Sequence, residues 1–186
     1  MRRGEAAALR WSSLAADDVL SVRTGAVDEQ GGIIEKLPKT GNRRQLLLDA
    51  TTAAMWRDRQ AVVSRELNTE GLTLQPDLYT FSNDPARRTP RRPDLVTKKW
   101  AVIRRRAGVT DDVELRSLRN WHITTLREAG FPLEFVGRRV GHEERSSSPL
   151  AMTASYTVSR IAQERAMADV IETRLAAVRP PAQHPT

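Results

Sequence analysis

Arginine, tyrosine and lysine are the residue types in this sequence whose chemistry is most informative. The planar guanidinium of arginine binds a phosphate through two parallel hydrogen bonds and so neutralises charge that grows on its oxygens. A tyrosine hydroxyl is a poor nucleophile at its usual pKa of about 10, but nearby cations stabilise the phenolate. A lysine can protonate a departing oxygen. Together these groups could break a phosphodiester bond without a metal ion.

The sequence offers such residues at suggestive positions. Arg116 and Arg119 are three apart, so in a helix they share a face. Lys39 lies in a turn-rich stretch, His142 follows a glycine, and Tyr156 comes fourteen positions later. Each has an ordinary structural alternative: a charge on a hairpin, a helix C-terminal histidine, or an aromatic side chain in the core.

The elements that would position these residues are mostly helical. Three β-leaning runs near the start predict a small three-stranded antiparallel sheet from residues 19–23, 33–37 and 45–48. Residues 68–93 predict a loop. Apolar periodicity predicts helices over residues 3–14, 52–67, 95–107, 115–129 and 132–140, a short helix holding Tyr156, and a long helix from Arg160 to Val178. The fold class is therefore mainly α with a small sheet (α+β).

Composition limits the possible partners and chemistry. The 186 residues carry 30 Lys and Arg against 23 Asp and Glu, a formal net charge of +7, which favours a polyanionic partner. There is no cysteine, and His122, His142 and His184 are dispersed, so we expect no disulfide, no metal site and no cofactor. We also expect no membrane segment, no small-molecule substrate and a cytoplasmic location.

Positive charge is concentrated in one segment. Residues 87–106 contain nine basic residues and a single acidic one, Asp94. A solvated helix face is the ordinary explanation of a charge run, but this segregation favours a surface that contacts a phosphate backbone. The predicted contacts within this segment are Arg87, Arg88, Arg91, Arg92, Lys98 and Lys99.

Five motifs, taken in order, resemble the catalytic domain of the tyrosine recombinases, the phage-integrase family. They are Arg2-Arg3-Gly4-Glu5 with Leu9-Arg10-Trp11, then Pro38-Lys39-Thr40-Gly41-Asn42-Arg43-Arg44, Leu115-Arg116-Ser117-Leu118-Arg119, Val140-Gly141-His142 and Met152-Thr153-Ala154-Ser155-Tyr156. The resemblance implies a recombinase catalytic domain over residues 1–178. The proline-rich composition after it predicts a disordered tail over residues 179–186. It also implies site-specific breaking and rejoining of double-stranded DNA through a 3′-phosphotyrosyl intermediate.

The resemblance also assigns roles to individual residues. Tyr156 would attack the phosphate, and Lys39 would protonate the leaving 5′-oxygen. Arg2, Arg119 and His142 would stabilise the transition state, while Arg43 and Arg44 would hold the DNA backbone. In this family the C-terminal helix packs on a neighbouring protomer, so residues 160–178 are a candidate for self-association on DNA; completing the domain's own core is the equal alternative.

Two departures from the family pattern bear on activity. Arg116 stands where the family has a histidine, or sometimes a lysine, that transfers protons, and arginine does not deprotonate near neutral pH. The chain also begins where the first catalytic arginine falls, without the preceding helix and DNA-clamping domain. We therefore expect an incomplete domain, either trimmed or a decayed prophage integrase, in which binding persists while chemistry slows.

The sequence is also compatible with two other functions. A catalytically inactive protein that binds double-stranded DNA would use the same basic surface and a structural Tyr156. An RNA-binding module is less favoured, because the chain has only nine aromatic residues and no stacking platform of alternating aromatic and basic residues.

Overall fold

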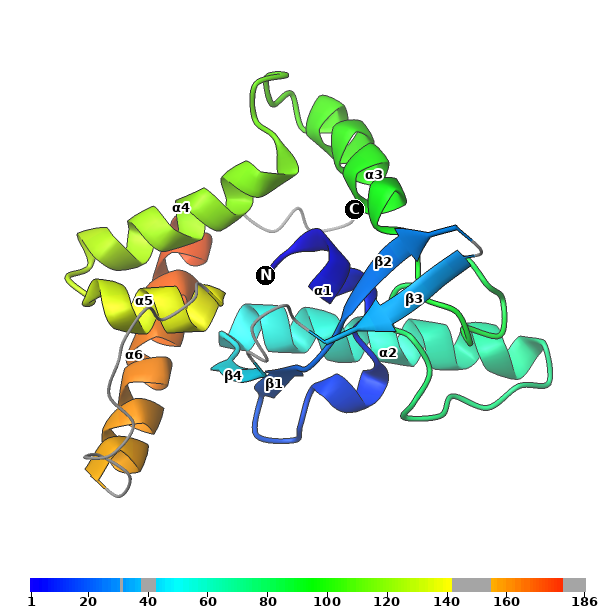
Figure 1. The fold of residues 1–186 in the computed structure, drawn as a ribbon, viewed down its shortest axis with the longest axis horizontal. Coiled ribbons are helices and arrows are strands. Elements are labelled where there is room, and N and C mark those ends of the chain that lie inside the picture. The colour runs from blue at the N-terminus through cyan, green and yellow to red at the C-terminus, as the bar shows by residue number, and fades with distance from the viewer. Residues whose placement is uncertain (31, 38–42, 142–154, 179–186) are drawn as a thin grey trace, which may run out of the picture.

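The structure is a computed structural model that describes residues 1–30, 32–37, 43–141 and 155–178, of which 155–160 are described only as backbone. Lys39 and His142 lie outside the described residues, as does the predicted tail over residues 179–186. Six α-helices and four strands are formed over the described ranges (Figure 1). The chain is therefore mainly α with a small antiparallel β component, as the sequence predicted.

The strands form two separate pairs instead of one three-stranded sheet. After α1 (Arg3–Ala7) and a short 3-10 turn, β1 (Val19–Val22) pairs antiparallel with β4 (Arg44–Leu47). Between them, β2 (Gly25–Glu29) and β3 (Gly32–Lys36) form a hairpin. The prediction missed β2 because glycine, alanine, aspartate and glutamate, residues of low β propensity, make up most of it.

The long helix α2 (Ala50–Thr69) covers the N-terminal part of the molecule. Its start is set by Asp49, whose carboxylate accepts a 2.8 Å hydrogen bond from the backbone N–H of Thr52. Val63 and Leu67 of this helix pack on Trp11 in one buried cluster. The β1–β4 pair contributes Leu20, Val22 and Leu46 to a second cluster, so α2 and the strands enclose the N-terminal core.

Residues 70–92 form the predicted loop, which Tyr79 ties to the N-terminal part through an isolated β-bridge with Arg10. The loop leads to α3 (Pro93–Arg106), with proline at the first helical position, where its missing N–H costs no helical hydrogen bond. In Figure 1, α3 stands on one side of α1 and α4 on the other.

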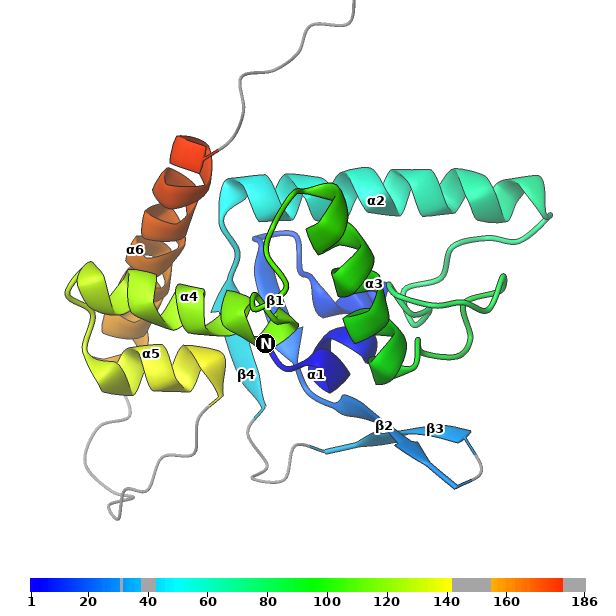
Figure 2. The ribbon, with the colours of Figure 1, turned by 90° about the horizontal axis from the view of Figure 1, so that it is seen from above.

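The C-terminal part consists of α4 (Leu115–Glu128), α5 (Leu133–Val140) and α6 (Ser155–Val178). Leu126, Val136, Met167 and Ile171 bring the three helices together in one buried cluster. Figure 2 shows α6 beside the start of α2, and Glu172 of α6 accepts a 2.8 Å hydrogen bond from the Thr51 N–H. Helix α6 thus packs on the core of its own domain.

Helix α6 also corrects the prediction of two C-terminal helices. The sequence analysis separated a short helix at Tyr156 from a long one beginning at Arg160, but residues 155–178 form a single helix. No glycine or proline interrupts this stretch, so no residue in it forces a break. No described helix is both long enough and apolar enough to cross a membrane.

Candidate active site

A pocket of about 910 Å³ lies between α1 and α3 on one side and α4 on the other. Its wall combines apolar side chains, among them Trp100, Leu118 and Trp121, with arginines. Arg2 and Arg119, the two arginines that the family resemblance singled out, both line it. The fold therefore brings together two residues that are 117 positions apart in the sequence.

Arg2 is held by backbone and carboxylate contacts at the start of α1. Its backbone N–H donates to Glu5 Oε2 at 2.7 Å, which closes the first turn of the helix. Its guanidinium donates to the carbonyl of Gly141 at 3.1 Å and lies 3.6 Å from Glu5 Oε1. About half of the side chain (53%) remains exposed, so the guanidinium can still meet a ligand.

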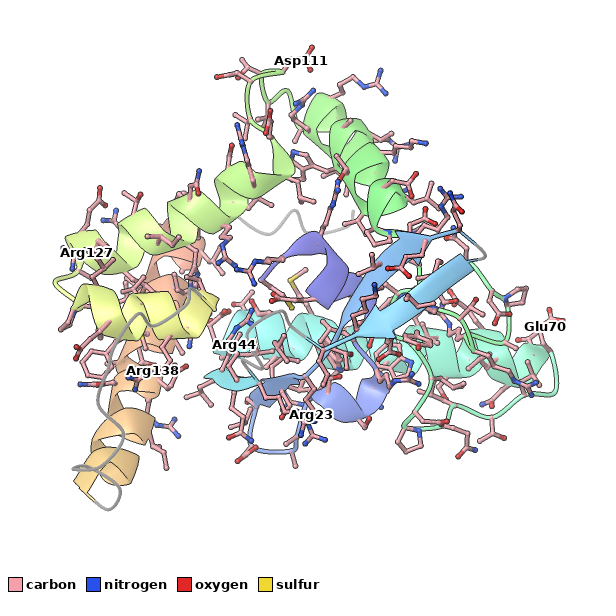
Figure 3. The ribbon with its side chains drawn as sticks, viewed as in Figure 1. Arg23, Arg44, Glu70, Asp111, Arg127 and Arg138 are labelled. Atoms are coloured by element: carbon pink, nitrogen blue, oxygen red, sulfur yellow. The ribbon has the colours of Figure 1, made fainter. Side chains whose placement is uncertain are left out.

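Arg44 lies behind Arg2 and is not available at the surface. Its side chain is buried and its two terminal nitrogens bind the carboxylate of Glu5 at 3.1 and 2.7 Å. Figure 3 shows Arg44 between α1 and α5. The prediction that Arg44 contacts the DNA backbone is therefore wrong for this structure, because burial removes it from any surface that a duplex could touch.

Gly141 is required beside Arg44 for two reasons. It ends α5 in the left-handed region, with φ of 74°, a conformation that glycine adopts without strain. A Cβ at this position would also lie 2.6 Å from Nη1 of Arg44. The carbonyl of the same glycine accepts from Arg2, so the end of α5 is fixed directly before His142.

Glu5 stays ionised under these arginines. Burial alone would raise the pKa of its carboxyl, but hydrogen bonds from the Arg44 side chain and the Arg2 N–H outweigh it and lower the pKa below the usual value. A buried carboxylate can be kept charged only when it is paired in this way. Glu5 thus fixes the distance between Arg2 and Arg44.

Arg119 faces the pocket with an unused donor. Its Nη1 is buried and has no hydrogen-bond partner within the described ranges. Burial and then the positive charge of Arg2 lower the pKa of its guanidinium. A buried donor without a partner costs free energy. A phosphate bound in the pocket would offset the repulsion between the two positively charged arginines.

Arg139 also lines the pocket, and its side chain binds three other elements. Its Nε donates to Nε2 of His122 at 3.2 Å, its Nη2 donates to the carbonyl of Leu47 at 2.9 Å, and its Nη1 pairs with Glu164. Burial, followed by the charge of Arg139, lowers the pKa of His122 to about 4. His122 is thus a neutral acceptor at physiological pH.

Sequence reasoning did not find Glu5, Arg139 and Glu164 as parts of the site. One signal was present for Arg139, which lies three residues after Val136 and directly before Val140, on the buried face of α5. A charged residue on an apolar helix face is seldom buried unless it is paired. Its partner Glu164 is 25 positions away in a different helix, so the pairing itself is not visible in the sequence.

Arg116 is placed differently from Arg119. It also lines the pocket, but its side chain is 80% exposed and pairs with Glu114 at 2.7 Å. Lys39 and His142 lie outside the described residues. Tyr156 lies in the first turn of α6, whose backbone is described there.

The basic segment divides into buried and exposed residues. Arg87 is buried and donates to the Thr80 carbonyl at 3.2 Å and to Glu66 at 3.3 Å, so its predicted DNA contact is wrong for this structure. Arg91 is half-buried. The exposed predicted contacts are Arg43, Arg88, Arg92, Lys98 and Lys99, of which Arg92 pairs with Asp28 at 2.7 Å and Lys98 with Asp94 at 3.4 Å.

The other tyrosine of the chain, Tyr79, is engaged in the interior. Its hydroxyl accepts from Arg10 at 2.6 Å and donates to Glu35. Burial and the Glu35 carboxylate raise its pKa to about 12. Tyr79 is therefore poorly suited to form a phenolate.

Among the described residues, no three His, Asp or Glu side chains are grouped so that they could hold a metal ion.

Comparison with known structures shows that the chain shares its fold with a transposon integrase. The chain is similar to the Tn1549 transposon integrase in complex with a circular intermediate DNA, with a TM-score of 0.61 and 13% identity over 88% of this chain and 54% of that one. A second structure of that integrase, with transposon right end DNA, gives a TM-score of 0.55 and 14% identity over 96% and 55%.

The chain spans about half the length of the integrase chains it matches. No family model matches the sequence, and no curated protein matches it.

Proposed function

We propose that this domain binds double-stranded DNA and breaks and rejoins it through a 3′-phosphotyrosyl intermediate on Tyr156, acting in the cytoplasm. The observation that carries the proposal is that Arg2, at the start of α1, and Arg119, in α4, line the same pocket. Two guanidinium groups that line one pocket suit a phosphate, whose non-bridging oxygens gain charge as the bond breaks.

The fold supports the same function. The similar Tn1549 integrase structures contain DNA, as a circular intermediate or a transposon end. The contacts of Arg44 with Glu5 and of Arg2 with Gly141 hold the pocket wall in place before any ligand arrives. Preorganised cations of this kind stabilise a transition state without having to reorganise during the reaction.

Tyr156 is the better of the two tyrosines as a nucleophile. Tyr79 is excluded by its raised pKa and by the contacts of its hydroxyl with Glu35 and Arg10. Tyr156 lies at the start of α6, a helix that packs against α4, which carries Arg119. The sequence resemblance assigns the nucleophile to the same residue.

The proposed reaction needs no cofactor, because DNA and side chains of this domain supply every bond and proton that it uses. The phenolate oxygen of Tyr156 bonds to the scissile phosphorus as the bond from phosphorus to the 5′-oxygen breaks, and that oxygen takes a proton from Lys39. Arg2, Arg119 and His142 stabilise the charge on the phosphate. The energy of the broken bond is kept in the phosphotyrosine, so a 5′-hydroxyl can attack it, restore the phosphodiester and release the tyrosine.

Arg116 makes the first step slow. An arginine cannot accept the tyrosine proton near neutral pH, and the exposed Arg116 pairs with Glu114. The proton must therefore pass to solvent. We propose that the site is a degenerate one, as expected for a prophage remnant, in which DNA binding exceeds catalysis.

The exposed basic residues are the proposed duplex contacts. Arg43, Arg88, Arg92, Lys98 and Lys99 keep their predicted role, because each is exposed. Helix α6 packs on its own core, but its exposed Ile161 and Val178 leave apolar surface for self-association on DNA. Sedimentation of the protein with and without a duplex tests that association.

Covalent trapping tests the proposal. The protein is incubated with nicked duplexes that carry candidate attachment sequences, and a band that resists denaturant is sought. We expect the band to vanish in Tyr156→Phe and to persist in Tyr79→Phe, the matched control. A band that survives in Tyr156→Phe would contradict the proposal.

The alternative function is DNA binding without catalysis, which the exposed Arg116 favours. It predicts duplex binding that weakens with salt and no covalent band from any variant.

A further inference from the structure

We propose that Arg139, Glu164, His122 and the Leu47 carbonyl form a positioning junction that sets α6, and with it Tyr156, relative to Arg119. His122 and Arg139 of this junction also line the pocket, and their side chains are hydrogen-bonded to each other. It rests on the proposed function only in taking Tyr156 as the nucleophile. Its role is to fix one helix against three other elements.

The junction joins four elements through one side chain. Arg139 of α5 reaches Nε2 of His122 on α4, the carbonyl of Leu47 on β4 and the carboxylate of Glu164 on α6. The Leu47 N–H also donates to Glu164 Oε2 at 3.2 Å. The planar guanidinium has fixed donor directions, so the four elements can satisfy it in few relative orientations.

The two ends of the junction lie on the elements that carry the proposed chemistry. His122 is three residues after Arg119 in α4, so both lie on one face of the helix, and both line the pocket. Glu164 is eight residues after Tyr156 in α6, about two turns along the same helix. A shift of α6 at Glu164 would therefore move the start of the helix relative to Arg119.

A second contact links the junction to Arg2. The backbone carbonyl of Arg139 accepts from Nε of Arg44 at 3.1 Å, and Arg44 holds the Glu5 carboxylate beside Arg2. The buried network thus runs without a break from Arg2 to α6. Positional errors of about 1 Å can cost about 10²-fold in rate, so such a network would affect the chemical step more than binding.

The test uses two junction variants in the full chain. Glu164→Gln keeps the shape of the side chain and removes its charge, and the double variant Arg139→Met with Glu164→Leu replaces the ion pair by apolar groups of similar size, a change that folded proteins often tolerate. The matched control is Arg174→Met with Glu128→Leu, because this exposed pair at 3.6 Å also joins α6 to α4.

Two quantities are measured for each protein: the duplex Kd by fluorescence anisotropy, and the rate of covalent trapping on a nicked duplex. We expect the junction variants to trap DNA at least about tenfold more slowly, with Kd within about twofold of the parent. The control should change neither quantity by more than about twofold. Equal losses of binding and trapping, or an unchanged trapping rate, would overturn the proposal.

Hydrogen exchange separates this proposal from the proposed function. Peptides from the first half of α6 should exchange faster in the junction variants, while those from α2 stay unchanged. If the parent forms no Tyr156-dependent adduct, the proposed chemistry fails, and exchange alone then decides whether the junction positions α6. Unchanged exchange in α6, or faster exchange throughout the protein, would overturn the positioning role.

Discussion

Arginines in two regions of this molecule have opposite tasks. In the interior, Arg44 and Arg139 are buried and bound to Glu5 and Glu164, where they hold elements together. Along the segment from Arg88 to Lys99, most basic side chains are exposed, and those with ion pairs keep them at the surface. The comparison shows that an arginine-rich sequence does not by itself mark a DNA contact, because burial and a carboxylate partner decide the role.

The largest expected effect comes from breaking the interior pair. Arg44→Met leaves the Glu5 carboxylate buried without its main partner, so the free energy of unfolding should fall by about 3–5 kcal/mol. Urea unfolding measures this. Arg88→Ala, an exposed control, should change stability by no more than about 0.5 kcal/mol. A loss below about 1 kcal/mol for Arg44→Met would remove the distinction between the two regions.

The second-largest expected effect concerns Arg116, an exposed residue that lines the pocket. Arg116→His restores a side chain that can accept a proton at neutral pH, so the rate of covalent trapping should rise about 10- to 100-fold. The duplex Kd should change little, because Arg116 is one of many exposed cations. Single-turnover trapping at pH 7 measures the rate, and an unchanged rate would show that proton transfer from the tyrosine is not the slow step.

The His122 contact predicts a dependence of stability on pH. The folded pKa of about 4 lies below the unfolded value of 6.5, so the unfolded state binds more protons between these values. Stability is fully present above pH 6.5 and should fall by about 1–2 kcal/mol between pH 6.5 and pH 5.

Urea unfolding at the two pH values measures this loss. In His122→Gln, whose amide oxygen can still accept from Arg139, most of the loss should disappear. A loss that remains equally large in that variant would assign it to other groups.

The smallest effect concerns the surface. Replacing Arg88 and Lys99 by alanine together should reduce the slope of log Kd against log salt concentration by about 2, because two phosphate contacts are lost. Arg87→Met, in which the buried neighbour of Arg88 is changed, should leave the slope as it is. The opposite pattern would mean that Arg87, not Arg88, reaches the duplex.

The sequence predicted the parts of the fold that depend on local pattern. The structure confirms α3, α4 and α5 to within two residues, because apolar spacing and terminal glycines define them locally. Pairing between segments far apart in the chain was harder to predict from the sequence. The single sheet was wrong because β1 pairs with β4 across the β2–β3 hairpin, and strand pairing depends on contacts far apart in the chain.

The candidate site shows the same division. Motif order was enough to select Arg2 and Arg119, and the fold places both in the lining of one pocket. The burial of Arg44 and Arg87 could not be predicted from the sequence, because their carboxylate partners lie 39 and 21 residues away along the chain. Whether an arginine is buried depends on such partners, which no short motif contains.

Identifying the residue that becomes linked to DNA tests most directly whether Tyr156 is the nucleophile. After trapping, the protein is digested and the nucleotide-bearing peptide is sequenced by mass spectrometry. If Tyr156 is the nucleophile, a nucleotide linked through its 3′-phosphate will be found on the peptide that contains Tyr156 and none on the peptide that contains Tyr79. A nucleotide on any other residue would contradict it, as would an adduct yield that is the same in parent and Tyr156→Phe.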